Sequence, residues 1–357
     1  AEQGKWSQRY FGDNMYDLLL RQSIFQLLWN GGGNKAVQLA VFDKYEKLIA
    51  QYEAVGNRDA ELLTRLERLM YWQRNGWRYP QQLSDEQVLE QLQAWAKAYD
   101  GVDACAALYV SWADFYHQKQ DFVSEMKVIE EGIKRYPSSE FTADLKDKQR
   151  IVCMPSLSVQ VTHPYPQAEA ELRVTSKNLK GATLEWYRLN LKASSSVFAR
   201  NLEHADLIKK YGTLVDKVRL DLPDTPTYKD TVSVLTSRMP EAGIYILKSI
   251  PDGYKDKMGY DVVYLSALQV ASFPMEGRQT ECHVVDRKTG KPVAGAELVF
   301  YSIPVSGNYT LYKTFKTDKQ GKVVVPDMKE SLWMHARAGK DEFMQVAYWS
   351  RRVLPTV

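Results

Sequence analysis

The sequence predicts a multidomain fold of the α + all-β type, in which an α-helical region is followed by two β-sandwiches. Two observations lead to this prediction. Apolar residues recur at helical spacing as far as residue 152, and from Met154-Pro155 onward short runs alternate Val, Thr and Tyr with polar residues. The length of 357 residues suits two or three domains, at about 100–200 residues each. We expect a helical domain at 1–152 and sandwiches at 153–258 and 259–357.

The helical region is predicted from successive apolar faces, each repeating every three or four residues. The first face consists of Val37, Val41, Tyr45, Leu48 and Tyr52. Further faces lie within residues 62–70, 88–99, 104–115, 122–133 and 141–145. Short connections between helices of this length predict antiparallel helix pairs.

Residues with defined roles at helix ends mark several of the boundaries. Ser84 and Gln87 form a capping-box pattern at the start of the helix that carries residues 88–99, and Gly101 suits the C′ position at its end. Pro137 ends a later helix because proline cannot continue one, and we expect Ser138 to cap the last helix.

The helix pair at residues 103–137 resembles a tetratricopeptide repeat in four positions, which are Ala113, Tyr116, Gly132 and Pro137. Glu125 departs from the repeat because a small residue is expected there. Stacked helix pairs of this TPR-like kind form concave surfaces that hold peptides or partner domains. The same stack could instead pack only on its neighbours, and the sequence leaves both interpretations open.

The first sandwich is predicted from six strands, at residues 157–162, 169–175, 184–189, 214–220, 228–235 and 246–250. A polar segment near 197–211 is expected to be a helical insertion between two of them. The order Pro240, Gly243, Tyr245 resembles the tyrosine corner of immunoglobulin-like sandwiches, in which the hydroxyl bonds to the backbone.

The second sandwich is predicted from strands at 262–270, 280–286, 297–301 and 322–325. Gly290 and Gly321 suit turns with positive φ, and we expect the turn at 318–321 to close a hairpin. Pro292 belongs at a strand start or edge because it cannot donate to a ladder. The small pair Gly295-Ala296 is expected to allow close approach of the facing sheet.

Two strings in this region carry a family resemblance. TGKPVAGAELVFY at 289–301, followed by TDKQG at 317–321, resembles the macroglobulin-type β-domains of bacterial α2-macroglobulin family proteins, which are Ig-like or fibronectin-like sandwiches. AGIYILKSIPDG and VVYLSALQVAS look like a junction of two such domains, and NMYDLLL looks like the helical region of Bacteroidetes-type members. The same turn-and-strand string also occurs in adhesin-type modules, so a generic sandwich is the alternative.

The resemblance implies a role without a reactive group in this chain. Members of the family are secreted or periplasmic traps that enclose a protease after it cleaves a bait segment, and many carry a thioester within a Cys-x-Glu-Gln string. Cys105, Cys153 and Cys282 lie outside any such string. The implied function is therefore a structural framework fragment of a broad-spectrum endopeptidase inhibitor, without the bait region or the thioester.

Its implied partners are proteases, bound through the full-length protein, and other domains of the same polypeptide. The implied location is periplasmic, outer-membrane-anchored or extracellular, with a lipid anchor upstream. The alternative is a free-standing cell-surface scaffold that binds proteins through its helices and uses its sandwiches as a stalk.

Composition and motif spacing favour no other class of function. A net charge of +3, with no run of five basic residues, does not favour nucleic acid, and the sequence has no stretch of 18 apolar residues that would predict a transmembrane segment. The three scattered cysteines predict buried thiols and no disulfide framework. The histidines show no metal-ligand spacing; they are His117, His163, His204, His283 and His335.

The remaining candidates have ordinary structural explanations. His117 is expected at the surface or in the last turn of a helix, and Cys282 and His283 should face opposite sides of a strand. Residues 31–33 suit a helix–helix linker, and the acid pairs at 130–131 and 341–342 suit solvated surface. We therefore predict no catalytic, cofactor-binding or metal-binding residues and no enzymatic activity.

Overall fold

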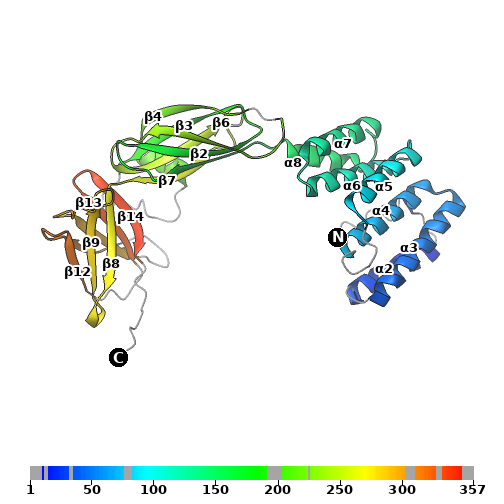
Figure 1. The fold of residues 1–357 in the computed structure, drawn as a ribbon, viewed down its shortest axis with the longest axis horizontal. Coiled ribbons are helices and arrows are strands. Elements are labelled where there is room, and N and C mark those ends of the chain that lie inside the picture. The colour runs from blue at the N-terminus through cyan, green and yellow to red at the C-terminus, as the bar shows by residue number, and fades with distance from the viewer. Residues whose placement is uncertain are drawn as a thin grey trace. The chain divides into compact units, whose positions relative to one another are not determined.

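A computed structural model of the protein describes residues 10–11, 15–31, 35–75, 83–190, 203–223, 226–302, 310–326 and 332–347. The chain divides into two compact units. One comprises Ala1–Met154 together with Pro226–Tyr228, and the other comprises Pro155–Thr225 and Lys229–Val357. The first unit is helical, and the second is built mainly from antiparallel sheets (Figure 1). The predicted order of an α-helical region followed by β-sandwiches is therefore confirmed.

The helical unit contains seven helices among the residues that the structure describes. They are α2 (Met15–Gly31), α3 (Lys35–Val55), α4 (Arg58–Asn75), α5 (Asp85–Ala98), α6 (Cys105–Gln118), α7 (Phe122–Arg135) and α8 (Thr142–Val152). Helices adjacent in sequence pack on one another from α2 to α4 and from α5 to α8, and α4 also packs on α6. The predicted apolar faces form one continuous core, in which Leu48, Leu108 and Ile129 are fully buried.

Helix ends confirm one predicted cap and correct two others. The backbone N–H of Gln87 donates to Ser84 Oγ at 3.2 Å, and that of Ser84 donates to Gln87 Oε1 at 2.8 Å, so the capping box is confirmed. Gly101 has φ +80° but follows the C′ position, because Tyr99 is the cap residue. Ser138 does not cap α8. A turn closed by the Ser139 N–H and the Tyr136 carbonyl precedes that helix instead.

The first sandwich has two antiparallel sheets with strand orders β1-β2-β5 and β4-β3-β6-β7. The strands are β1 (Ser156–Thr162), β2 (Glu169–Lys177), β3 (Gly181–Leu189), β4 (Gly212–Asp221), β5 (Thr231–Arg238), β6 (Gly243–Pro251) and β7 (Gly259–Leu265). Helix α9 (His204–Tyr211) lies in the predicted insertion, whose residues before 203 are outside the described part. Tyr245 Oη donates to the Glu241 carbonyl at 2.8 Å, which confirms the expected hydroxyl–backbone bond.

The strand predicted at 262–270 is two strands, β7 and β8 (Leu268–Pro274). Strand β7 pairs with β6 over its whole length, so the predicted boundary at residue 259 is wrong and residues 259–265 complete the first sandwich. At the break, side chains accept the backbone N–H groups: that of Ala267 donates to Asp341 Oδ2 at 2.8 Å and that of Leu268 donates to Ser266 Oγ at 3.0 Å. Only Ser266 and Gln269 interrupt the apolar run at 262–270, and neither Gly nor Pro marks this change of sheet.

The second sandwich has strand orders β12-β9-β8 and β11-β10-β13-β14. Its further strands are β9 (Thr280–Asp286), β10 (Glu297–Ser302), β11 (Thr310–Lys316), β12 (Lys322–Val325), β13 (Leu332–Ala338) and β14 (Asp341–Ala347), with a short 3-10 helix η3 (Glu276–Arg278) before β9. Strands β11, β13 and β14 were not predicted. Leu298, Phe300 and Val284 are fully buried in its core.

Two predicted turn roles need correction. Gly290 and Gly321 have the expected positive φ values of +70° and +71°. However, the turn at 318–321 joins β11 to β12, which belong to different sheets. It therefore carries the chain from one sheet to the other and does not close a hairpin. Gly295 has φ +69°, and a Cβ added to it would meet no other atom within 4 Å. The positive φ therefore accounts for a glycine at this position, and the predicted close approach of the facing sheet does not.

Gly132 of α7 gives a test of the helical core. A Cβ on Gly132 would lie 2.8 Å from both Tyr109 Cβ and Leu145 Cδ1, so the three helices α6, α7 and α8 meet where no side chain fits. We predict that Gly132→Ala lowers the free energy of unfolding by about 1–3 kcal/mol through overpacking. Urea denaturation followed by helical circular dichroism measures this. Lys127→Ala, at an exposed position of the same helix, is the control, and an equal effect of both changes would contradict the prediction.

Candidate functional site

The two sandwiches share an apolar cluster that lies outside both of their cores. It consists of Leu189, Leu207, Ile244, Ile246 and Met344, and we call it the joint. Ile244 and Ile246 point out of the first sandwich because β6 alternates, with Tyr245 and Leu247 facing the core. Strand β14 of the second sandwich, which carries Met344, contacts both β6 and β7. The outer face of one sheet is thus buried by an element of the next domain.

Helix α9 covers part of the same surface. Leu207 is buried in the joint, and Ile208 and Tyr211 pack against it. The ring of His204 stacks on that of Tyr260 from β7, with centroids 6.2 Å apart. The predicted insertion is therefore a structural part of the contact between the sandwiches.

A polar contact joins the sandwiches at a second point. Tyr165, in the loop between β1 and β2, donates its hydroxyl to Asp286 Oδ2 at 2.8 Å. Asp286 Oδ1 accepts the backbone N–H of Thr289 at 2.8 Å and its hydroxyl at 2.9 Å. The Thr289 N–H, the Tyr165 hydroxyl and the Thr289 hydroxyl together lower the pKa of Asp286 to about 2. Arg287 and Lys288 lie 5.5 Å from the Tyr165 ring centroid.

A third group of polar side chains lies on β13 and β14. His335 is buried, and its Nε2 is 2.9 Å from Glu342 Oε2. Asp341 Oδ2 accepts the N–H of Ala267, in the segment that connects the sandwiches. The predicted solvated pair at 341–342 is therefore wrong, because both carboxylates bond to protein groups. His335 Nδ1 and Asp341 Oδ1 have no hydrogen-bond partner among the described residues.

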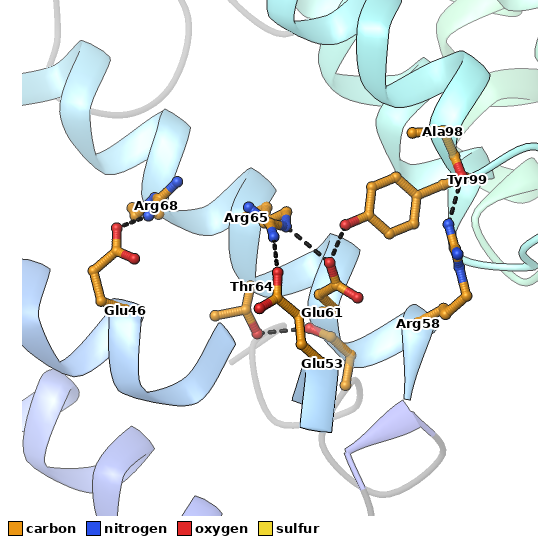
Figure 2. Close-up of polar contacts among 10 residues, drawn as sticks. Glu46, Glu53, Arg58, Glu61, Thr64, Arg65, Arg68, Ala98 and Tyr99 are labelled. Atoms are coloured by element: carbon orange, nitrogen blue, oxygen red, sulfur yellow. Dashed lines mark hydrogen bonds and ion pairs between the residues drawn. The ribbon is translucent and has the colours of Figure 1, made fainter. Parts of the chain in front are cut away.

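The helical unit carries its own polar network along α4 (Figure 2). Arg65 contacts the carboxylates of Glu61 and Glu53, which connects α4 to α3, and its Nε is 3.0 Å from Glu61 Oε1. The hydroxyl of Tyr99, at the end of α5, donates to the same Glu61 oxygen. Arg68 pairs with Glu46 of α3. Acidic and basic side chains thus pair within α4 and between α4 and α3, and Tyr99 connects them to the end of α5.

Helix α2 joins this network through Arg21. Its Nη2 donates to Thr64 Oγ1 at 2.8 Å and its Nη1 lies 3.2 Å from Glu67 Oε2. Burial and the bond to Glu61 raise the pKa of Tyr99 to about 12, so its hydroxyl remains a proton donor. Each charged side chain named above has a partner of opposite sign, an arrangement that fixes helices in register and supplies no group poised for proton transfer.

Glu125 explains why the TPR-like pattern fails at that position. Its carboxylate is buried between α6 and α7, and Glu125 Oε2 is 3.0 Å from His117 Nδ1. Burial raises the pKa of Glu125, and His117 opposes that rise. His117 itself is half-exposed in the last turn of α6, as predicted.

The cysteines and the expected glycine linker agree with the predictions only in part. Cys105 and Cys282 are buried as predicted, whereas Cys153 is exposed, and none of the three cysteines forms a disulfide. Cys282 is buried while His283 is partly exposed, so the two face opposite sides of β9. Gly31 ends α2, and residues 32 and 33 of the expected linker lie outside the described part.

Among the residues that the structure describes, no group of three or more His, Cys, Asp or Glu side chains is arranged to hold a metal ion. No helix in the same ranges is long and apolar enough to cross a membrane.

Comparison with known proteins finds similarity only among solved structures. No protein-family model matches the chain, and no curated protein matches it. The chain is similar to Escherichia coli α2-macroglobulin, in a crystal structure spanning domains NIE-MG1, at 14% identity over 54% of this chain and 97% of that chain, with a TM-score of 0.41. Bacterial α2-macroglobulins are thus structural neighbours at low identity and partial coverage.

Two further similarities are weaker. Salmonella α2-macroglobulin reacted with methylamine is 10% identical over 54% of this chain and 16% of that chain, with a TM-score of 0.23. Red sea bream transglutaminase is 13% identical over 58% of this chain and 33% of that chain, with the same TM-score of 0.23.

The contact between Tyr165 and Asp286 predicts an acid-sensitive contribution to stability. A carboxyl group with a lowered pKa stabilises the folded state above its unfolded pKa of about 3.9, and this contribution is lost as the pH falls toward about 2. We predict that Tyr165→Phe lowers the free energy of unfolding of the β unit by about 1 kcal/mol at neutral pH, and that the difference shrinks at the acid end.

Urea denaturation at several pH values measures this effect. Tyr254→Phe removes the hydroxyl of a tyrosine that is exposed in the same unit, and we expect it to resemble the wild type. A deficit in Tyr165→Phe that is constant over the whole pH range would contradict the assigned bond to Asp286.

Proposed function

We propose that this chain is a structural framework segment of a secreted, α2-macroglobulin-like, broad-spectrum endopeptidase inhibitor. In this proposal the bait region and any thioester lie elsewhere in the polypeptide, and the chain has no catalytic activity of its own. The observation that carries the proposal is the joint, because it unites two consecutive sandwiches that contain the macroglobulin-type strings.

The physical requirement on such a segment is stiffness. A trap wall built from consecutive sandwiches transmits a rearrangement only if neighbouring domains keep their mutual orientation. Domains connected by small polar interfaces are expected to move relative to each other, whereas a hydrophobic interface restrains them. Here the apolar joint, the Tyr165–Asp286 bond and the Ala267–Asp341 bond restrain the two sandwiches at separate points.

The finer parts of the proposal follow the family resemblance. The full-length protein is of the Bacteroidetes type, lies in the periplasm or on the outer membrane facing outward, and carries a lipid anchor upstream. Its partners are proteases, and this segment contacts other domains of the same polypeptide. The sandwiches are Ig-like or fibronectin-like, and the helical unit is TPR-like.

The proposal predicts size-dependent inhibition by the full-length polypeptide. After reaction with that polypeptide, trypsin should still hydrolyse a small chromogenic peptide but should cleave casein more slowly, because the trapped enzyme excludes large substrates. Residues 1–357 alone should leave both reactions unchanged. Sequencing the reading frame beyond Val357 should reveal further sandwich units. Equal rates on casein with and without the full-length polypeptide would refute the proposal.

A variant of the joint connects this assay to the structure. Met344→Asp places a charge in the buried cluster, and we expect it to weaken inhibition by the full-length polypeptide. Val232→Asp makes the same change at an exposed position of the first sandwich and is the matched control.

A further inference from the structure

Helix α2 carries large apolar side chains on its solvent side. They are Leu18, Leu19, Phe25, Leu28 and Trp29, with exposed fractions of 44%, 57%, 56%, 36% and 79%. We call this surface the α2 outer face. Its opposite side is also apolar, because Ile24 is buried in the helical core and Leu20 and Leu27 pack against that core. A helix that is apolar on all sides is normally buried on all sides.

The α2 outer face contains no charged side chain between residues 17 and 29. Both charged residues in this range point elsewhere. Asp17 is buried, and Arg21 stacks on the Phe11 ring at 3.5 Å while it pairs with Glu67. The polar residues on the exposed side are the neutral Gln22 and Gln26. An ordinary solvated helix face would be charged, so this one is suited to contact with protein.

We propose that a second copy of this chain covers the α2 outer face, with the two α2 helices packed antiparallel about a two-fold axis. A symmetric contact brings identical surfaces together, so it requires a face that does not repel itself. An axis near Ser23 and Ile24 sets Leu18 of one copy opposite Trp29 of the other. It also sets Phe25 of one copy opposite Gln22 of the other, whereas Leu19 and Leu28 lie on opposite edges of the contact.

The available area matches what a weak, reversible dimer needs. With side chains of roughly 200 Å² each, the exposed parts of Leu18, Leu19, Phe25 and Trp29 amount to about 470 Å² per copy, or about 900 Å² for the pair, which is in the size range of transient interfaces. Phe25 and Trp29 stack with centroids 6.2 Å apart, so the largest side chains are already ordered before association. These features indicate a weak, reversible dimer, and its existence does not depend on the proposed function.

Sedimentation equilibrium of the full chain tests the inference. We expect a monomer–dimer equilibrium with a dissociation constant in the micromolar range, and Trp29→Glu should raise that constant at least about tenfold. Phe25→Glu should do the same. Val55→Glu, on an exposed apolar residue at the far end of α3, is the control and should leave the constant unchanged. Circular dichroism confirms that each variant is folded.

The location of the contact is tested by disulfide trapping in a Cys153→Ser background. A mixture of Leu18→Cys and Trp29→Cys chains should form the mixed dimer faster than either variant alone forms its own. A chain that stays monomeric overturns the proposal, and so does a dimer that is insensitive to both Trp29→Glu and Phe25→Glu. Equal trapping in all three preparations would overturn the two-fold antiparallel arrangement.

Discussion

The burial of β6 on both faces is the constraint on which the β unit depends. Tyr245 and Leu247 fill the core of the first sandwich, while Ile244 and Ile246 fill the joint. Because the joint includes Met344 of β14, neither sandwich can turn without exposing apolar area. The bond of Tyr245 to the Glu241 carbonyl fixes the backbone where β6 begins, so the register of this strand sets the position of the second domain as well as the first.

The succession of helices and sandwiches could be predicted because it depends on local periodicity. The apolar faces of α3 to α8, the capping box at Ser84 and the strands β1 to β6 follow from spacing alone. The boundary at residue 259 could not be predicted in the same way, because β7 and β8 are separated only by Ser266 and Ala267, without Gly or Pro, and are distinguished by their long-range partners. Asp341, which accepts the N–H at the break, lies 74 residues away.

The joint itself was missed for a related reason. An outward-facing isoleucine in β6 has the same local pattern as a core residue, and no periodicity shows which domain covers it. A usable signal was nonetheless present. The run from Gly243 to Leu247 is buried throughout, and a continuous apolar strand is typical of sheets covered on both faces. Glu125 is the opposite case, since a charged residue within a helix-pair pattern gave no indication of its bond to His117.

Helix α2 shares one property with strand β6, although the two belong to different units. Strand β6 and helix α2 are both apolar on two sides, and in each case the inner side meets the core of its own domain. For β6 the outer side is covered by α9 and by Met344. For α2 the outer side exposes Phe25 and Trp29 to solvent. The charged side chains of Asp17 and Arg21 are directed inward. Since solvent exposure of such a face is unfavourable in proportion to its apolar area, the arrangement of α2 is consistent with a surface that is completed by association.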